Sequence, residues 1–399
     1  MMKTLEVTRF GPIKGGCVSF GDLTVLVGPQ ASGKSLFVQL FKLIEDLDSI
    51  RKTLMEHGFD WSKADDFLDL YFGEGMKSIW NHFHHNTQVF ADDFTWDLPG
   101  GFEIAAHKVP GAKESVFLIP AQRVLVLQDG WPSPLSRSIA APYCMRMFSE
   151  TLRRLLEQKL GKGESFFPQP RRLKKELRQL IDRSIYVGGK VKLDTQAMRK
   201  RLVLQPGEGK AVLPYSAWSA GQREFTPLLL GLYWLIPGAA IPKQPDIETV
   251  IIEEPEMGLH PQAILSFCMM VLVLLHRGYR VIISTHSPVV LDVVWALREL
   301  RACKEETALR CLKNIFQLHG GIFHGAPMEK VLHHALGIEC KTYFFERRPR
   351  AMDVLIKDIS SLDPGDEDEG VSGWGGLSGF SGRVADLVGE ALREGQRSS

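Results

Sequence analysis

The chain has 399 residues, with 48 Lys and Arg against 47 Asp and Glu, so its net charge of +1 excludes a molecule that binds a partner by bulk charge alone. Its 44% hydrophobic and 24% charged residues are ordinary for a soluble globular protein, and its length suits one large α/β domain with insertions or two lobes. The six cysteines form no CxxC pair, which excludes a paired-cysteine zinc site, and residues 1–10 have no apolar signal core. A cytoplasmic location is therefore expected.

The first predicted element is a small β-meander over residues 3–27, whose last strand ends at the sequence GPQASGKS. The glycines of this loop let successive N–H groups point at an anion, and the helix predicted after it adds the positive end of its dipole. Lys34 would reach the β- and γ-phosphates, and the Ser35 hydroxyl would ligate Mg²⁺. The strand–loop–helix context therefore predicts a nucleotide-binding loop formed by Gly28, Pro29, Gln30, Ala31, Ser32, Gly33, Lys34 and Ser35.

The middle of the chain is predicted to form an inserted regulatory lobe, residues 51–214. It follows an N-terminal lobe of residues 1–50 that contains the predicted nucleotide-binding loop. Its charge is uneven: residues 41–105 hold thirteen Asp and Glu against five Lys and Arg, whereas residues 151–210 hold sixteen Lys and Arg against six Asp and Glu. The basic stretch could contact nucleic-acid phosphates or could be the solvated face of a helical lobe. Both interpretations remain open.

Residues 215–300 bring back regular structure and three further motifs. In WSAGQREF, Ser219 can cap a helix, and the N–H groups of Ala220 and Gly221 lie open for a phosphate. The uncharged stretch 225–242 that follows is interrupted by prolines and glycines, so we expect a buried helix and turn rather than a membrane span. Taken alone, the SAGQ sequence is only a helix cap.

Two apolar strands of this region end in polar residues. In VIIEEPE, we assign Glu253 to Mg²⁺ and Glu254 to the attacking water, because adjacent carboxylates at a strand end can serve both tasks. In VIISTHSP, His286 follows the strand and can hydrogen-bond the γ-phosphate or the water. Glu254 and His286 are therefore the predicted catalytic residues. Residues 301–360 are predicted as a C-terminal α/β extension, and the Gly- and Ser-rich residues 361–399 as a flexible tail.

These motifs and their order resemble the ABC-type ATPase heads of the SMC, RecF and OLD group. The resemblance implies a P-loop α/β fold with a mixed central sheet, and an Mg²⁺-dependent ATPase that uses ATP. It also implies that each ATP is shared between two subunits of a dimer or higher homo-oligomer. The trans signature residues are then Ser219, Ala220, Gly221 and Gln222. Gln122, in IPAQR, corresponds to a glutamine that reaches Mg²⁺ in the family, although the same residues also fit a structural turn.

The residues of these motifs resemble those of the RecF/OLD branch more than those of transporter ATPases. Transporters carry Asp where Glu253 stands here, and Gly where Ala220 stands. The insertion is too short and too interrupted for a long coiled-coil arm, and no TOPRIM-like Asp-x-Asp stands at a strand end. The chain therefore resembles stand-alone ATPase subunits of bacterial anti-phage systems such as PARIS and Septu, which control a separately encoded nuclease or toxin. A RecF-type DNA-repair ATPase that binds duplex DNA is the alternative, followed by a transporter ATPase subunit.

Overall fold

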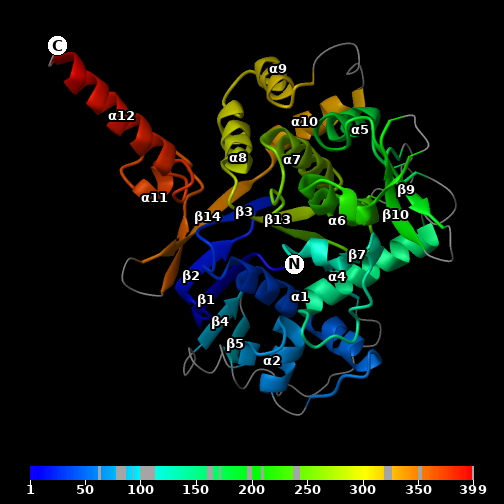
Figure 1. Ribbon diagram of the computed structural model, residues 1–399. Coiled ribbons are helices and arrows are strands. Elements are labelled where there is room, and N and C mark those ends of the chain that lie inside the picture. Colours follow the sequence, from blue (N-terminus) through cyan, green and yellow to red (C-terminus); the bar gives the residue numbers. More distant parts are fainter. Residues whose placement is uncertain are drawn as a thin grey trace.

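A ten-stranded mixed sheet forms the centre of the protein (Figure 1). The computed structural model describes residues 1–61, 64–77, 87–92, 94–98, 113–159, 165–169, 172–195, 200–207, 211–236, 243–318, 326–348 and 353–397. The strand order is β5-β4-β1-β2-β15-β14-β3-β13-β12-β6. The strands are β1 Thr4–Phe10, β2 Ile13–Ser19, β3 Leu23–Val27, β4 Thr87–Ala91, β5 Phe94–Leu98, β6 Val116–Ile119, β12 Thr249–Glu253, β13 Arg280–Thr285, β14 Cys340–Arg347 and β15 Val354–Asp358. This arrangement confirms the predicted α/β class with a mixed central sheet. The predicted meander over residues 3–27 is wrong in its last strand, because β15 and β14 lie between β2 and β3.

Helices cover both faces of the parallel part of the sheet, which comprises β14, β3, β13, β12 and β6. Such strands are buried on both sides, which explains their continuous apolar sequences. In β12, Ile251 belongs to the same core cluster as residues of α1, whereas Val250 and Ile252 belong to the cluster that includes α6 and α7. The helices are α1 Lys34–Glu56, α2 Ala64–Phe72, α4 Tyr143–Arg154, α5 Lys175–Ile181, α6 Ala220–Leu235, α7 Pro261–His276, α8 Pro288–Leu300, α9 Glu305–Ile315, α10 Ala326–Gly337, α11 Glu369–Ser372 and α12 Gly379–Arg397.

Shorter elements complete the lobe around residues 123–217. They are the helical turns η2 Arg123–Val126, η3 Leu155–Lys159, η4 Asp182–Tyr186 and η6 Tyr215–Ala217, and the strands β7 Leu127–Gln128, β8 Trp131–Pro132, β9 Lys190–Asp194, β10 Arg201–Gln205 and β11 Leu213–Pro214. Strands β9 and β10 pair in antiparallel orientation. Among the described residues, no helix is both long and apolar enough to cross a membrane.

The segments that the sequence divides into lobes share one sheet. Strand β6 comes from the predicted insertion and pairs with β12, while β14 comes from the predicted C-terminal extension and pairs with β3. Strand pairing between distant segments leaves no periodic signal in either of them, so the sequence did not indicate these neighbours. The structure therefore describes one continuous sheet that takes strands from each of these segments.

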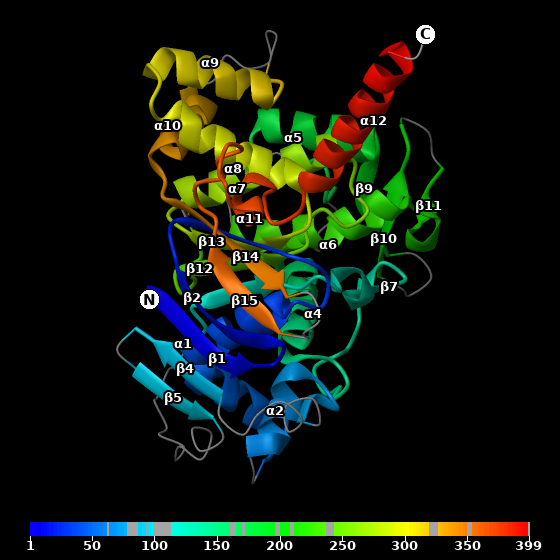
Figure 2. The ribbon, with the colours of Figure 1, turned by 90° about the vertical axis from the view of Figure 1, so that its left-hand side faces the viewer.

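The C-terminal residues, expected to form a loose tail, pack against the body before the last helix begins. The indole Nε1 of Trp374 donates to the carbonyl oxygen of Leu362 at 3.0 Å, and both residues are buried. Gly375 has φ 65°, and a Cβ there would lie 2.8 Å from atoms of Val27 and Phe344. Glycine therefore lets the chain pass close to β3 and β14. Helix α12 then extends away from the body (Figures 1 and 2).

A buried ionic cluster links α1 to β6. The Lys42 ammonium lies 2.8 Å from Asp46 and 2.7 Å from Glu114, and it donates to the carbonyl of Val116 at 2.6 Å. Asp46 in turn accepts hydrogen bonds from the backbone N–H and the hydroxyl of Ser115. The two carboxylates, with Asp46 foremost, outweigh the desolvation of Lys42 and raise its pKa. The cluster thus fixes the position of α1 on the sheet.

We expect Lys42→Met to lower the free energy of unfolding by about 3–5 kcal/mol, because it leaves Asp46 as an uncompensated buried charge. Urea unfolding followed by circular dichroism measures the change. Lys52→Met is the matched control: Lys52 lies on the exposed face of the same helix, 3.9 Å from Glu56, and its loss should have much less effect. Equal losses in the two variants would show that the buried cluster adds no net stability.

Candidate functional site

Three neighbouring parallel strands deliver the predicted site residues to the same edge of the sheet. Strand β3 leads into the loop of residues 28–33, β12 ends at Glu253, and β13 ends one residue before His286. Strand β13 lies between the other two, with Thr285 level with Val27 and Ser284 level with Glu253. The carboxyl ends of parallel strands are where ligands bind in such sheets. The fold therefore gathers residues from separate segments in one place.

The loop after β3 has the backbone conformation that its glycines allow. Gly28 has φ 147°, and a Cβ there would lie 2.7 Å from the carbonyl oxygen of Phe345 on β14. Gly33 has φ 89°, and a Cβ there would lie 2.9 Å from the ring of Pro12. Ala31 also has a positive φ, 56°. Larger residues at the two glycines would clash or be strained, so both support this tight turn into α1.

Lys34 is held over this loop. Its Nζ donates to the carbonyl oxygens of Gly28 at 2.8 Å and Pro29 at 3.0 Å, and it lies 3.3 Å from the Ser32 hydroxyl. Burial lowers the pKa of Lys34 to about 8, against the opposing effect of nearby carboxylates led by Glu254. The ammonium is therefore centred on the loop that would surround a phosphate, with its charge close to the carboxylates at the end of β12.

Glu253 and Ser35 form a pair suited to Mg²⁺. Glu253 is 1% exposed, and burial raises its pKa to about 7, while hydrogen bonds from the Ser35 hydroxyl and the Ala121 amide oppose the rise. Its Oε1 has no hydrogen-bond partner. A buried carboxylate oxygen without a donor, beside a hydroxyl, is a donor set that Mg²⁺ accepts. The residues present therefore fit this ion. The Gln122 side chain is exposed, so in this conformation it is Ala121 of this loop that contacts Glu253.

Glu254 and His286 lie side by side next to that pair. The Glu254 Oε1 is 3.6 Å from Nε2 of His286, and this neighbour is the main reason that the pKa of Glu254 is lowered. Glu254 has φ 42°, an uncommon conformation for a non-glycine residue, and its N–H donates to the carbonyl of Ser284 at 2.8 Å. The backbone N–H of His286 donates to Glu256. Glu254 is therefore ionised and held in a strained backbone, a combination often found at functional sites.

Arg123 is a central residue that the sequence analysis did not single out. It is 0% exposed, and its guanidinium donates to the carbonyl oxygens of Glu253 at 3.0 Å, Glu254 at 3.1 Å and Pro255 at 3.5 Å. Its Nε donates to the carbonyl of Glu224 on α6 at 3.1 Å. One side chain thus connects the carboxylate loop after β12 with the first turns of α6. Its place in IPAQR, directly after an apolar strand, was the available signal.

Arg347, at the end of β14, is a second contributor that sequence reasoning missed. Its Nη2 donates to the carbonyl oxygens of Gln30 at 2.8 Å and Ala31 at 3.0 Å. The side chain is exposed, and its charge adds a small contribution to the lowered pKa of Lys34. Because β14 is far from the loop in sequence, only the pairing of β14 with β3 reveals this contact.

Ser219 caps α6 in the manner expected from its sequence. Its hydroxyl accepts from the N–H of Gln222 at 3.3 Å, and the Gln222 Oε1 accepts from the N–H of Ser219 at 3.1 Å. A Cβ at Gly221 would lie 3.0 Å from the carbonyl oxygen of Gly258, so the helix start packs against the loop after β12. Ser219 and Ala220 are exposed. The signature segment is therefore rigid on one side and open to solvent on the other.

The fold and the site have the layout of a P-loop protein, with a glycine-rich loop between β3 and α1. Residues 147–292 match the family described as "AAA domain, putative AbiEii toxin, Type IV TA system". Over 94 residues, 24% of this chain, the sequence is 32% identical to the Old nuclease of Escherichia phage P2. That match spans 16% of the phage protein. By these matches and by the order of its site motifs, the chain is similar to ATPases of the SMC/OLD group.

Solved structures with similarity to the chain include SMC heads. One is the SMC head domain from Thermotoga maritima, with 12% identity, 90% of this chain and 98% of that chain covered, and a TM-score of 0.34. Another is an Smc head bound to the C-terminal winged-helix domain of ScpA, with 11% identity, 90% and 97% covered, and a TM-score of 0.37.

Proposed function

We propose that the chain binds ATP and hydrolyses it with the help of Mg²⁺. The observation that carries this proposal is the meeting of Lys34, Ser35, Glu253, Glu254 and His286 at the ends of three adjacent strands. Loop amides and Lys34 bind the phosphates. Ser35 and Glu253 would hold Mg²⁺, which offsets phosphate charge and orients the γ-phosphate. We leave Gln122 as a further candidate for that ion.

Glu254 acts as the base for the attacking water in this proposal. Its lowered pKa keeps the carboxylate in the ionised form that a general base needs. His286, 3.6 Å away, orients Glu254 and donates to the water or to the γ-phosphate. Arg123 holds the backbone on which both carboxylates stand. The site therefore supplies a proton acceptor beside phosphate-binding groups.

The residues Ser219, Ala220, Gly221 and Gln222 complete the site of a second copy of the chain. This proposal is supported by the solvent exposure of Ser219 and Ala220 at the positive end of α6, where N–H groups can meet a γ-phosphate. A symmetric pair would then contain two shared ATP sites, so that hydrolysis requires at least a dimer.

Mixing inactive variants tests whether sites are shared. Neither Lys34→Ala nor Ser219→Arg alone should turn over ATP. In a mixed dimer, one site combines the intact loop of one subunit with the intact signature of the other. Random pairing should therefore restore about a quarter of the wild-type rate, since half of the dimers are mixed and each has one intact site. The measurement is phosphate release after mixing.

The matched control is a Lys34→Ala, Ser219→Arg double variant mixed with Lys34→Ala. That mixture contains no intact loop, so its activity should stay at background. Absence of rescue in the first mixture, with mixed dimers demonstrated by differently tagged subunits, would argue that each subunit hydrolyses ATP alone.

We further propose that the ATPase acts in the cytoplasm as a sensor or scaffold in bacterial anti-phage defence, controlling a separately encoded nuclease or toxin. Support comes from the family description, which includes a putative toxin, and from the similarity to a phage nuclease. The test is plaque formation on cells that express the chain with its neighbouring genes. Protection that disappears with Glu254→Gln supports the role. Equal plaque numbers with and without expression of the chain contradict it.

The basic residues 151–210 favour the alternative, a RecF-type ATPase that acts on DNA, because this stretch contains sixteen Lys and Arg but only six Asp and Glu. Stimulation of ATP turnover by duplex DNA, lost steeply as salt rises, would support this alternative. A transporter role would instead require a membrane partner encoded nearby, and the motif wording disfavours it.

A further inference from the structure

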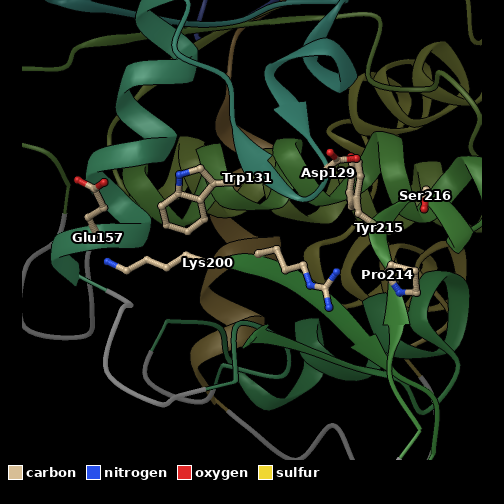
Figure 3. Close-up of a pocket in the computed structure, with 8 residues that line it drawn as sticks. Asp129, Trp131, Glu157, Lys200, Pro214, Tyr215 and Ser216 are labelled. Carbon is tan, nitrogen blue, oxygen red and sulfur yellow. The ribbon is translucent and has the colours of Figure 1, made fainter. Parts of the chain in front are cut away.

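A pocket of about 640 Å³ lies away from the strand-end site, in the lobe that precedes the signature segment (Figure 3). It is formed by the β7–β8 turn, the middle of η3, the start of β10 and the turn η6. Figure 3 shows Glu157, Trp131 and Lys200 toward one end and Asp129 and Tyr215 toward the other. Its volume is in the range of pockets that hold small organic ligands.

The wall of the pocket offers one aromatic surface. Trp131 is partly buried and packs against the main core, while its remaining surface lines the pocket. Tyr215 is 5% exposed, and its ring lies 5.0 Å from that of Trp218. An indole that is fixed on one side and open on the other is suited to stacking with a planar ring.

The charges around this surface are partly neutralised by neighbours. Glu157 lies 2.6 Å from Arg153, and Arg201 lies 3.1 Å from Asp194. Among the residues that the structure describes, neither Asp129 nor Lys200 takes part in an ion pair. As far as the described part of the chain goes, Asp129 and Lys200 therefore give the pocket an anion and a cation without ion-pair partners, beside the open face of Trp131. The surrounding stretch 151–210 is strongly basic, which favours a ligand with negative charge.

We propose that this pocket binds a nucleotide, with its base on Trp131, its phosphate near Lys200 and Arg201, and the amino group of the base toward Asp129. The base, the phosphate and the amino group of the ligand each have a matching group in the pocket wall. The same chemistry is offered by a free nucleotide and by one unit of a single strand of nucleic acid. The proposal goes beyond ATP hydrolysis and does not depend on it.

Occupancy of the pocket would act on the signature segment. Tyr215, which lines the pocket, donates its hydroxyl to the carbonyl of Arg223 in the first turns of α6 at 2.9 Å. The indole Nε1 of Trp218, next to Ser219, donates to the carbonyl of Leu213 at 3.1 Å. A ligand that contacts Tyr215 is therefore connected, through these two hydrogen bonds, to the start of α6, where Ser219 lies.

The test measures fluorescence anisotropy of a labelled deoxycytidine 12-mer with the full-length protein in the absence of ATP. We expect Trp131→Ala to weaken binding about 5- to 100-fold, the range measured for loss of one base–aromatic stack. Lys200→Glu, on an exposed side chain, should weaken binding and flatten its salt dependence. The matched control is Trp295→Ala, because Trp295 is 36% exposed on α8 and does not line the pocket.

Cytidine monophosphate, added as a competitor, distinguishes the two sources. Displacement of the 12-mer identifies a free nucleotide as sufficient, while binding of the 12-mer without displacement identifies the strand; both support the pocket. Wild-type affinity in Trp131→Ala and Lys200→Glu, or no binding of either probe to the native protein, overturns the proposal. These measurements need no ATP turnover, so they fail or succeed independently of the ATPase proposal.

Discussion

Glu254→Gln is expected to reduce ATP turnover by about 10²–10⁴-fold while ATP binding is retained, because it removes the proton acceptor but none of the phosphate-binding groups. The amide is close in size to the carboxylate and no longer carries the negative charge beside His286. Trapped ATP should then also strengthen association of subunits. Phosphate release gives the turnover, equilibrium binding of labelled ATP gives the affinity, and sedimentation with and without ATP gives the association.

Glu248→Gln provides the matched control. Glu248 directly precedes β12 at the end opposite Glu253, and its carboxylate pairs with Lys243 at 2.7 Å. Its substitution makes the same chemical change at the other end of β12, one residue before the strand, and should leave turnover near the wild-type value. If Glu254→Gln turns over ATP at that same rate, Glu254 is not the base.

Much of the site could be predicted because each motif is continuous in sequence. The loop of residues 28–35, the carboxylates after β12 and the histidine after β13 each follow a short apolar strand. Since parallel strands end at one edge of the sheet, three local patterns were enough to expect one shared location. The capping of α6 by Ser219 is likewise a local pattern, with Gln222 three residues further on.

The remaining contributors come from pairings between distant segments. Arg347 reaches the carbonyls of Gln30 and Ala31 only because β14 pairs with β3. Nothing in the sequence around β14 indicates that neighbour, so this region looked like an appended extension. Residues 373–376 were predicted to be flexible because they are rich in glycine. Glycine also permits close packing between distant segments, and here Gly375 lies against Val27.

The motif IPAQR illustrates the limit most clearly. Family resemblance drew attention to Gln122, whose side chain is exposed, whereas its neighbour Arg123 is 0% exposed and bonded to four carbonyl groups. Sequence alone does not tell which of two adjacent polar residues turns inward. Which side chain points into the core depends on the helical turn after β6 and on the carbonyl groups that pack against that turn.

Arg123→Lys is expected to lower kcat on the order of a hundredfold with little change in the affinity for ATP. Lysine keeps the charge, but a single ammonium cannot span the carbonyls of Glu224 and Glu254 that the guanidinium joins. Glu254 would lose the contact that supports its strained backbone, and small displacements of a reacting group are costly in rate. Among the described residues, no hydrogen bond or ion pair joins Arg123 to the loop of residues 28–35, so ATP affinity should be preserved. Steady-state turnover and equilibrium ATP binding measure the two quantities separately.

Arg146→Lys separates positioning from general destabilisation. Arg146 is 1% exposed, donates to the carbonyl of Leu70 and lies 5.0 Å from the ring centre of Phe59. Leu70 and Phe59 belong to the core cluster that includes residues of α1. Both variants should lower the midpoint of thermal unfolding, because each disturbs a buried guanidinium. Only Arg123→Lys should lower kcat in the fraction that remains folded. If both variants lose turnover and ATP affinity in proportion to their stability, Arg123 only supports the fold; a selective loss of kcat means that it positions Glu254 against the start of α6.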